Sequence, residues 1–253
     1  IDLLSEEQKN KILPRVVEGA YLGAMSLSEP DTGSDLASIS CRAVRDRDEW
    51  VITGNKYWCT FADGADYIVL FARTDSAPEE GKRHRGISAF ILDKERDSFP
   101  DGINGSEIPK IGYFGWKTWE LAFDEYRIPV DALIGAEGEA FYALAKGLDE
   151  ARAHTAARSI GLAQGALEDA LEYAAERKQF GRPIAQFQDL RFKVARMATD
   201  IEAARQLLYS VCDRIDLGER CDKEAAMVKY FASEMAERVT SDALQILGGA
   251  GYT

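Results

Sequence analysis

Hydrophobic and polar residues alternate with two different periods along this chain of 253 residues, and the change falls close to Pro129. Before it, short runs of branched and aromatic residues are separated by turn-forming residues. The clearest of these runs, each predicted to be a strand, are residues 50–53, 67–71, 86–92 and 119–123. Short strands at this spacing are typical of an antiparallel barrel or sandwich. Gly54 and Asn55 are predicted to close the first strand, and the polar residues 75–85 to form a surface loop.

Helical periodicity replaces this pattern in the second half of the chain. Residues 137–177 are rich in Ala, Leu and Glu and contain no proline, which predicts one long helix. Apolar residues then recur at alternating spacings of four and three, at Leu190, Val194, Met197, Ile201, Ala204, Leu208, Val211 and Ile215. Such a seven-residue repeat favours nearly parallel packing in a helical bundle. Gly218 is predicted to end this helix, and Asp222 to cap a third helix that Gly248 and Gly249 end.

Residues 5–19 predict one more helix ahead of the strands, so the expected order is helix, β-domain, helical bundle, which is an α+β fold. A net charge of −12 would repel nucleic acid. The chain has no run of about 18 apolar residues, so no membrane span is expected. The four cysteines lie far apart and there are two histidines, which makes a disulfide framework or a metal site unexpected and favours a reducing compartment.

Four short motifs carry candidate chemistry, although each also has a simpler structural interpretation. Residues 28–35 (SEPDTGSD) place hydroxyls, carboxylates and a glycine in one turn, where they could bond to their own backbone. Residues 58–60 (WCT) could be a half-buried aromatic residue beside a turn. Residues 177–188 could be a solvated helix end, and residues 245–251 (QILGGAG) a helix C-cap.

The order and spacing of these motifs resemble the acyl-CoA dehydrogenase family over essentially the whole chain. The four segments are similar to the family's TEPxxGSD, WIT, RxxFG…FQ and QxxGGxG motifs, and the chain is identified as a member of that family on this agreement. The resemblance implies the end of an otherwise largely absent N-terminal helical domain at residues 1–20. It also implies a middle β-domain, of barrel or sandwich type, at 21–134 and a truncated C-terminal up-down helical bundle at 135–253.

The resemblance implies FAD as the cofactor, with its flavin on the β-domain. Ser28 and the backbone around Leu27, with Met25 beside them, would contact the pyrimidine end of the flavin. Trp58 would pack beside the ring, and Thr60 would lie at flavin N5. The family shares each FAD between subunits, which implies a homo-oligomer, usually a tetramer. The residues that would reach a neighbouring subunit's FAD are Arg177, Phe180, Gln188, Gln245, Gly248 and Gly249.

The implied substrate is an acyl-CoA thioester, contacted by Ser34, Asp149 and Arg152. The last two match the family's DxxR, although a surface ion pair is the simpler interpretation of their spacing. The implied reaction is α,β-dehydrogenation to a trans-2-enoyl-CoA. A carboxylate removes the α-proton, the β-hydrogen leaves as a hydride to flavin N5, and the electrons pass to an electron-transfer flavoprotein.

No catalytic base is expected within this chain. The family's usual glutamate is expected beyond Thr253, and the alternative position in a minority branch is Ala151 here. Glu150 is adjacent, but one residue along a helix turns a side chain by about 100°. Ile1 in place of an initial Met also leads us to expect a missing preceding segment.

Several departures from the family pattern leave the acyl group open. Trp116 and Trp119 stand in a segment where relatives often carry an arginine and small residues, and they could line a binding surface or pack in the core. Two alternative functions also stay open. One is a related flavoenzyme such as an acyl-CoA oxidase, a desulfinase or a nitroalkane oxidase, and the other is a non-catalytic flavin-binding subunit of a hetero-oligomer. The expected location is cytoplasmic in a bacterium and the mitochondrial matrix in a eukaryote.

Overall fold

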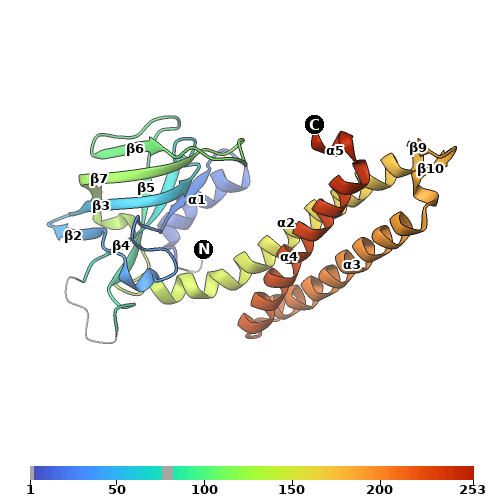
Figure 1. Ribbon diagram of the computed structural model, residues 1–253. Coiled ribbons are helices and arrows are strands. Elements are labelled where there is room, and N and C mark those ends of the chain that lie inside the picture. The colour runs from blue at the N-terminus through green and yellow to red at the C-terminus, as the bar shows by residue number, and fades with distance from the viewer. Residues whose placement is uncertain (1–2, 76–81) are drawn as a thin grey trace. The chain divides into compact units, whose positions relative to one another are not determined.

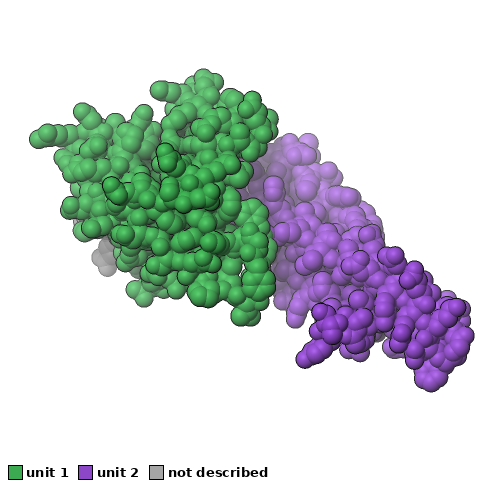
Figure 2. All heavy atoms as spheres, turned by 90° about the horizontal axis from the view of Figure 1, so that it is seen from above, with its two compact units in different colours: residues 1–144 green, residues 145–253 purple. Residues whose placement is uncertain are grey.

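A computed structural model describes residues 3–75 and 82–253 of the protein. The chain divides into two compact units, residues 1–144 and residues 145–253, which Figure 2 shows in different colours. The first unit contains an N-terminal helix and a β-sheet, and the second is mainly helical (Figure 1). The predicted α+β fold, a β-domain followed by a helical domain, is therefore confirmed.

The first unit opens with helix α1 (Glu6–Val17). Its start is fixed by a capping box, in which the Ser5 hydroxyl accepts from the Gln8 N–H and the Gln8 side chain accepts from the Ser5 N–H. The Gln8 amide also donates to the carbonyl of Leu133, at 2.9 Å. The cap thus starts the helix that was predicted over residues 5–19 and attaches it to the β-domain.

The first unit contains one sheet of eight strands, in the order β6-β7-β3-β2-β4-β5-β8, with β1 paired to β4. The strands are β1 (Gly23–Ser26), β2 (Arg42–Asp46), β3 (Glu49–Thr60), β4 (Tyr67–Arg73), β5 (Ile87–Asp93), β6 (Ile103–Glu107), β7 (Thr118–Pro129) and β8 (Leu133–Ile134). Most pairs are antiparallel, as predicted, but β1–β4 and β2–β4 are parallel. The alternation of apolar residues identifies strands but not their partners, so it could not distinguish the two directions.

The predicted end of a strand at Gly54 and Asn55 is wrong, because β3 continues to Thr60. Gly54 has φ +139°, and a Cβ atom there would lie 2.7 Å from the Cα of Cys41. The glycine therefore allows two backbone segments to approach closely within the sheet. The predicted surface loop at 75–85 falls largely on residues 76–81, outside the described residues, and residues 83–86 form a turn.

The core of the first unit lies against the sheet. The residues with no exposed surface that pack in it include Ile52, Ile68, Leu70, Phe90 and Leu121. Trp50 packs edge to face on Phe90, with ring centroids 5.3 Å apart. Trp119 is half-buried, and its Nε1 donates to Asp63 Oδ1 at 2.9 Å, whereas 43% of Trp116 is exposed. These two tryptophans therefore have different environments.

Three long helices build the second unit: α2 (Ala140–Glu176), of which residues 140–144 belong to the first unit, α3 (Gln188–Asp216) and α4 (Asp222–Leu247). The apolar repeat of α3 is confirmed, because Met197, Ile201, Ala204, Leu208 and Val211 are all buried in one core. Figure 1 shows α3 and α4 running side by side from a short turn. The short helix α5 (Gly249–Tyr252) follows α4.

The predicted cap at Asp222 is wrong. Cys221 occupies the N-cap position and makes no side-chain cap bond, while the Asp222 carboxylate accepts a hydrogen bond from Arg220 Nε at 2.7 Å. The neighbouring guanidinium offers the carboxylate a charged donor. The predicted helix end is confirmed at Gly218, which has φ +69° and follows the last turn of α3, and at Gly248, which has φ +58°.

Candidate functional site

The first candidate site lies where β1 meets the end of β3. The Tyr57 N–H donates to the carbonyl of Ser28 at 2.8 Å, and the Cys59 thiol donates to the carbonyl of Met25 at 3.3 Å. Burial raises the pKa of Cys59 to about 12, so the thiol keeps its proton for this bond. Two of the sequence motifs, far apart in the chain, are thus brought together.

A β-bulge in β3 decides which side chains face outward at this site. Lys56 pairs with Leu121 and Cys59 with Trp119, so three steps along β3 match two steps along β7. Lys56 and Cys59 are therefore both buried, while Trp58 is exposed, with φ +62°. A tryptophan in the left-handed region is strained, and such strain is concentrated at functional sites.

The outward surface combines apolar side chains with hydroxyl groups. Trp58 is 57% exposed and Met25 53% exposed, and Trp58 packs edge to face on Tyr57. The hydroxyls of Ser28 and Thr60 have no hydrogen-bond partner among the residues that the structure describes. Large apolar side chains beside hydroxyl donors suit a flat ring with polar edges, and the flavin ring is such a group.

A buried ion pair lies behind this surface. Lys56 Nζ is 2.9 Å from Glu29 Oε1, and the two side chains are 0% and 4% exposed. Burial alone would raise the pKa of Glu29, but the charge and hydrogen bond of Lys56 and the N–H groups of Ser40 and Cys41 lower it below its ordinary value. The carboxylate is therefore held ionised inside the protein.

Ser34, the predicted acyl-CoA contact, is exposed on the loop between Glu29 and Ser40. The 3-10 helix η1 (Leu36–Ser38) follows it. Arg73, at the end of β4, donates to the carbonyls of Ala37 at 2.7 Å and Ile39 at 3.0 Å. The Arg73 guanidinium thus holds the backbone of the loop that carries Ser34 through these hydrogen bonds.

The second candidate site is in the helical unit, at the connection between α2 and α3. Strands β9 (Lys178–Gln179) and β10 (Arg182–Pro183) form a small hairpin there, followed by η3 (Ile184–Gln186). Phe180 at its tip is 93% exposed and has φ +52°. The Arg177 side chain forms no ion pair with any residue in the described ranges, and Gln188 is exposed at the start of α3.

The end of α4 lies at the same end of the bundle. Lys193, near the start of α3, pairs with Asp242, near the end of α4, at 2.5 Å. Gln245 is exposed, and a Cβ atom added to Gly248 or Gly249 would meet nothing within 4 Å. The open backbone and the exposed guanidinium of Arg177 suit a diphosphate, which a planar guanidinium binds through two oxygens. The residues of both clusters therefore fit the two chemical parts of FAD.

Asp149 and Arg152 bond to each other, with Arg152 Nη1 2.6 Å from Asp149 Oδ1. This is the i,i+3 pair that the simpler interpretation predicted, and both side chains are partly exposed. Glu150 is exposed on the same helix, next to Ala151. The pair leaves donors and acceptors on both residues for another partner.

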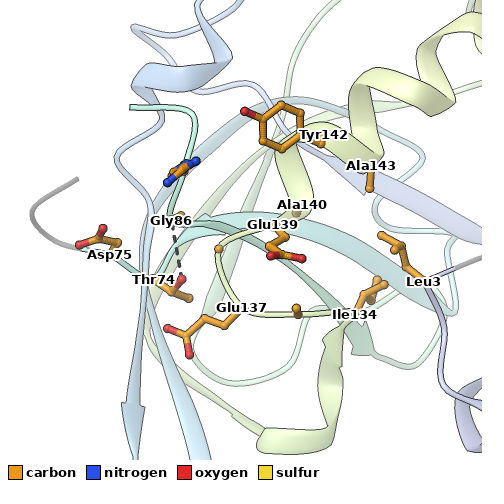
Figure 3. A pocket seen from close by; sticks show the side chains of 13 residues that line it. Leu3, Thr74, Asp75, Gly86, Ile134, Glu137, Glu139, Ala140, Tyr142 and Ala143 are labelled. Atoms are coloured by element: carbon orange, nitrogen blue, oxygen red, sulfur yellow. Dashed lines mark hydrogen bonds between the residues drawn. The ribbon is translucent and has the colours of Figure 1, made fainter. Parts of the chain in front are cut away.

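Sequence reasoning missed a pocket in the first unit, a cavity of about 840 Å³ (Figure 3). Its wall contains Asp75, Arg85, Glu137, Glu139 and Tyr142, and none of the residues predicted for flavin or acyl-CoA. The nearest signal in the sequence was the glycine-rich segment at 135–138, which had no motif to mark it. Three carboxylates against one guanidinium make the wall acidic, which disfavours a polyanionic ligand.

Comparisons with known proteins agree with the motifs. The model of the acyl-CoA dehydrogenase middle domain matches residues 24–126, and that of the C-terminal domain matches residues 138–253. A (2S)-methylsuccinyl-CoA dehydrogenase of Cereibacter sphaeroides is 43% identical over 98% of this chain. The chain spans 46% of that relative's length.

Two solved structures are similar in fold. One is butyryl-CoA dehydrogenase from Megasphaera elsdenii, with a TM-score of 0.91 and 38% identity over 98% of this chain and 63% of that one. The other is a chain from a study of the electron transferring flavoprotein of Acidaminococcus fermentans, with a TM-score of 0.91 and 42% identity over 98% of this chain and 64% of that one. The chain belongs to the acyl-CoA dehydrogenase family.

Within residues 3–75 and 82–253, no helix combines the length and the apolar character needed to cross a membrane. In the same ranges, no group of three or more His, Cys, Asp or Glu side chains is arranged to hold a metal ion.

Proposed function

We propose that the protein containing this chain is a flavin-dependent acyl-CoA dehydrogenase, which converts an acyl-CoA thioester to a trans-2-enoyl-CoA. One observation carries the proposal: β1 and the bulged end of β3 join to present Met25, Ser28, Trp58 and Thr60 together. Family membership supports the same reaction class, and the dehydrogenases among the relatives act on CoA thioesters by name.

The residues of the first site would bind and orient the flavin. Trp58 and Met25 would pack on the ring, and the Ser28 and Thr60 hydroxyls would donate hydrogen bonds to its polar edge. FAD, when bound, supplies the two-electron oxidation. Donors fixed beforehand at positions where negative charge accumulates stabilise that charge without reorganisation. Thr60 would act in this way beside N5, and Ser28 beside the pyrimidine end.

The residues of the second site would serve a neighbouring subunit. Arg177 and Gln188 would bind the diphosphate and Phe180 would pack on the cofactor, while Gln245 and the backbone at Gly248 and Gly249 would approach it closely. A site completed in this way requires at least a dimer, and we propose a homotetramer. Ser34, Asp149 and Arg152 would contact the acyl-CoA.

The catalytic base is proposed to lie outside residues 1–253, and the electron acceptor to be an electron-transfer flavoprotein. A relative among the solved structures comes from a study of such a flavoprotein, which supports this acceptor. The location would be cytoplasmic in a bacterium and the mitochondrial matrix in a eukaryote.

Anaerobic titration of the full-length protein with acyl-CoA thioesters tests the proposal. The expected result is a flavin absorbance that substrate bleaches, with reoxidation by an added electron-transfer flavoprotein. A bound flavin that no acyl-CoA thioester bleaches would contradict the reaction and favour a non-catalytic subunit. Rapid reoxidation by oxygen alone would favour the oxidase instead.

A further inference from the structure

The buried ion pair between Glu29 and Lys56 lies directly behind the residues assigned to the flavin. Glu29 follows Ser28 in the chain, and Lys56 precedes Trp58 by two residues. Lysine and glutamate are almost never buried this completely unless they are paired and hydrogen-bonded. A pair buried this completely cannot be explained as an ordinary surface ion pair.

Lys56 bonds to the backbone of the loop as well as to its carboxylate. Its Nζ donates to the carbonyl of Leu27 at 2.9 Å and to Glu29 Oε1 at 2.9 Å. The same lysine stands at the bulge that turns Trp58 outward. One ammonium group thus holds the segment around Ser28 against the part of β3 that carries Trp58.

The carboxylate of Glu29 bonds in the other direction. Oε2 accepts from the N–H of Ser40 at 2.7 Å and from its hydroxyl at 2.8 Å, and Oε1 accepts from the N–H of Cys41 at 2.9 Å. These bonds close the loop that begins at Glu29 and carries Ser34. The Glu29 carboxylate is therefore bonded to Lys56, on the strand that carries Trp58, and also to Ser40 and Cys41, at the end of the loop that carries Ser34.

We propose that Glu29 and Lys56 are positioning residues that couple the flavin-contacting segment to the Ser34 loop. The inference rests on the proposed function. Replacing a buried ion pair by apolar residues of similar size is often neutral for stability, so stability alone does not account for the pair. Holding two ligand-contacting segments in a fixed relation does account for its position and for its four hydrogen bonds to other groups.

The test compares three full-length proteins: wild type, the double variant Glu29→Gln with Lys56→Met, and the control Ile52→Val. The double variant removes both charges and keeps the side-chain volumes similar, so no unpaired charge is buried. Ile52 is fully buried in the same strand, and its truncation loosens the core without touching the loop.

For the double variant we expect the dissociation constant of FAD from the apoprotein to rise about tenfold or more, as charge-assisted bonds are lost. Amide exchange at Ser40 and Cys41 in the apoprotein should quicken while that of β4 stays unchanged. KM for acyl-CoA should rise by a larger factor than the flavin reduction rate falls. Ile52→Val should leave the FAD dissociation constant, the amide exchange and KM unchanged.

Wild-type affinity, exchange and KM in the folded double variant would overturn the inference. The same losses in Ile52→Val would also overturn it, because they would follow from stability alone. A wild-type protein that binds no flavin would instead overturn the proposed function, and the inference with it. The exchange measurement needs no flavin, so the two failures are distinguished.

Discussion

The main-chain N–H of Tyr57 donates a 2.8 Å hydrogen bond to the carbonyl of Ser28, and this bond joins the two motifs that the sequence placed on separate segments. It lies between Lys56, which is buried, and Trp58, which is exposed. The bond therefore fixes the point at which β3 changes from core packing to ligand-facing side chains.

Thr60→Ala tests the polar edge of the first site. If the hydroxyl stabilises charge that develops during reduction, the variant should reduce its flavin at least about tenfold more slowly, with a smaller change in acyl-CoA binding. Rapid-mixing reduction at saturating substrate measures the rate. Thr53→Ala, in the same strand but outside the segment from Lys56 to Thr60, is the matched control and should keep the wild-type rate. Equal rates in both variants would remove Thr60 from the site.

Arg177→Ala tests the second site. Losing a charge-assisted bond to a diphosphate should cost about 1.5–3 kcal/mol, so the assembled protein should retain markedly less FAD. Flavin content per chain after gel filtration is the measurement. Arg220→Ala is the control, because Arg220 is exposed in the same unit and pairs with its neighbour Asp222. Full flavin occupancy in Arg177→Ala would contradict the assignment.

The Glu29 carboxylate predicts a specific dependence of stability on pH. Its folded pKa is lower than its ordinary value of 4.5, so the unfolded state binds the proton more readily. The stabilisation is then fully present above about pH 4.5 and is lost as the pH falls through the folded pKa. The free energy of unfolding of wild type and of Glu29→Gln is measured with urea between about pH 3 and about pH 7. It should fall less in acid for the variant than for wild type.

Glu6→Gln is the control for this series, because the Glu6 side chain is 84% exposed on α1. It should keep the wild-type dependence on pH. If Glu29→Gln loses as much free energy of unfolding in acid as wild type does, the buried carboxylate is not responsible for that loss.

The sequence was sufficient for the elements whose apolar period is long and regular, such as the repeat in α3, because that period directly determines the buried face. It was insufficient for β3, where Gly54 looked like a turn and instead permits close contact with Cys41. The bulge at Trp58 depends on the pairing with β7, and no local pattern encodes a partner strand. For the same reason the pairing of Lys56 with Glu29 could not be predicted, since only the folded sheet brings them together.

Glu150 is the carboxylate next to the position where a minority branch of the family is expected to carry its base. A general base must come within hydrogen-bond reach of the proton that it removes. Glu150 is exposed on α2, and it lies about 100° around the helix from Ala151, which has no proton-accepting group. Its replacement should therefore leave the chemistry of the full-length protein intact.

Glu150→Gln keeps the size of the side chain and removes its basicity, so the expected result is a flavin reduction rate within about twofold of wild type, a change of well under 1 kcal/mol. Asp149→Asn is the informative comparison, since it weakens the bond to Arg152 and should raise KM for acyl-CoA. The rates are measured by rapid mixing at saturating substrate over a range of pH. A large fall in the reduction rate of Glu150→Gln, with the loss of the acid limb of the pH profile, would make Glu150 the base. It would also require α2 to turn this residue toward the flavin in the assembled protein.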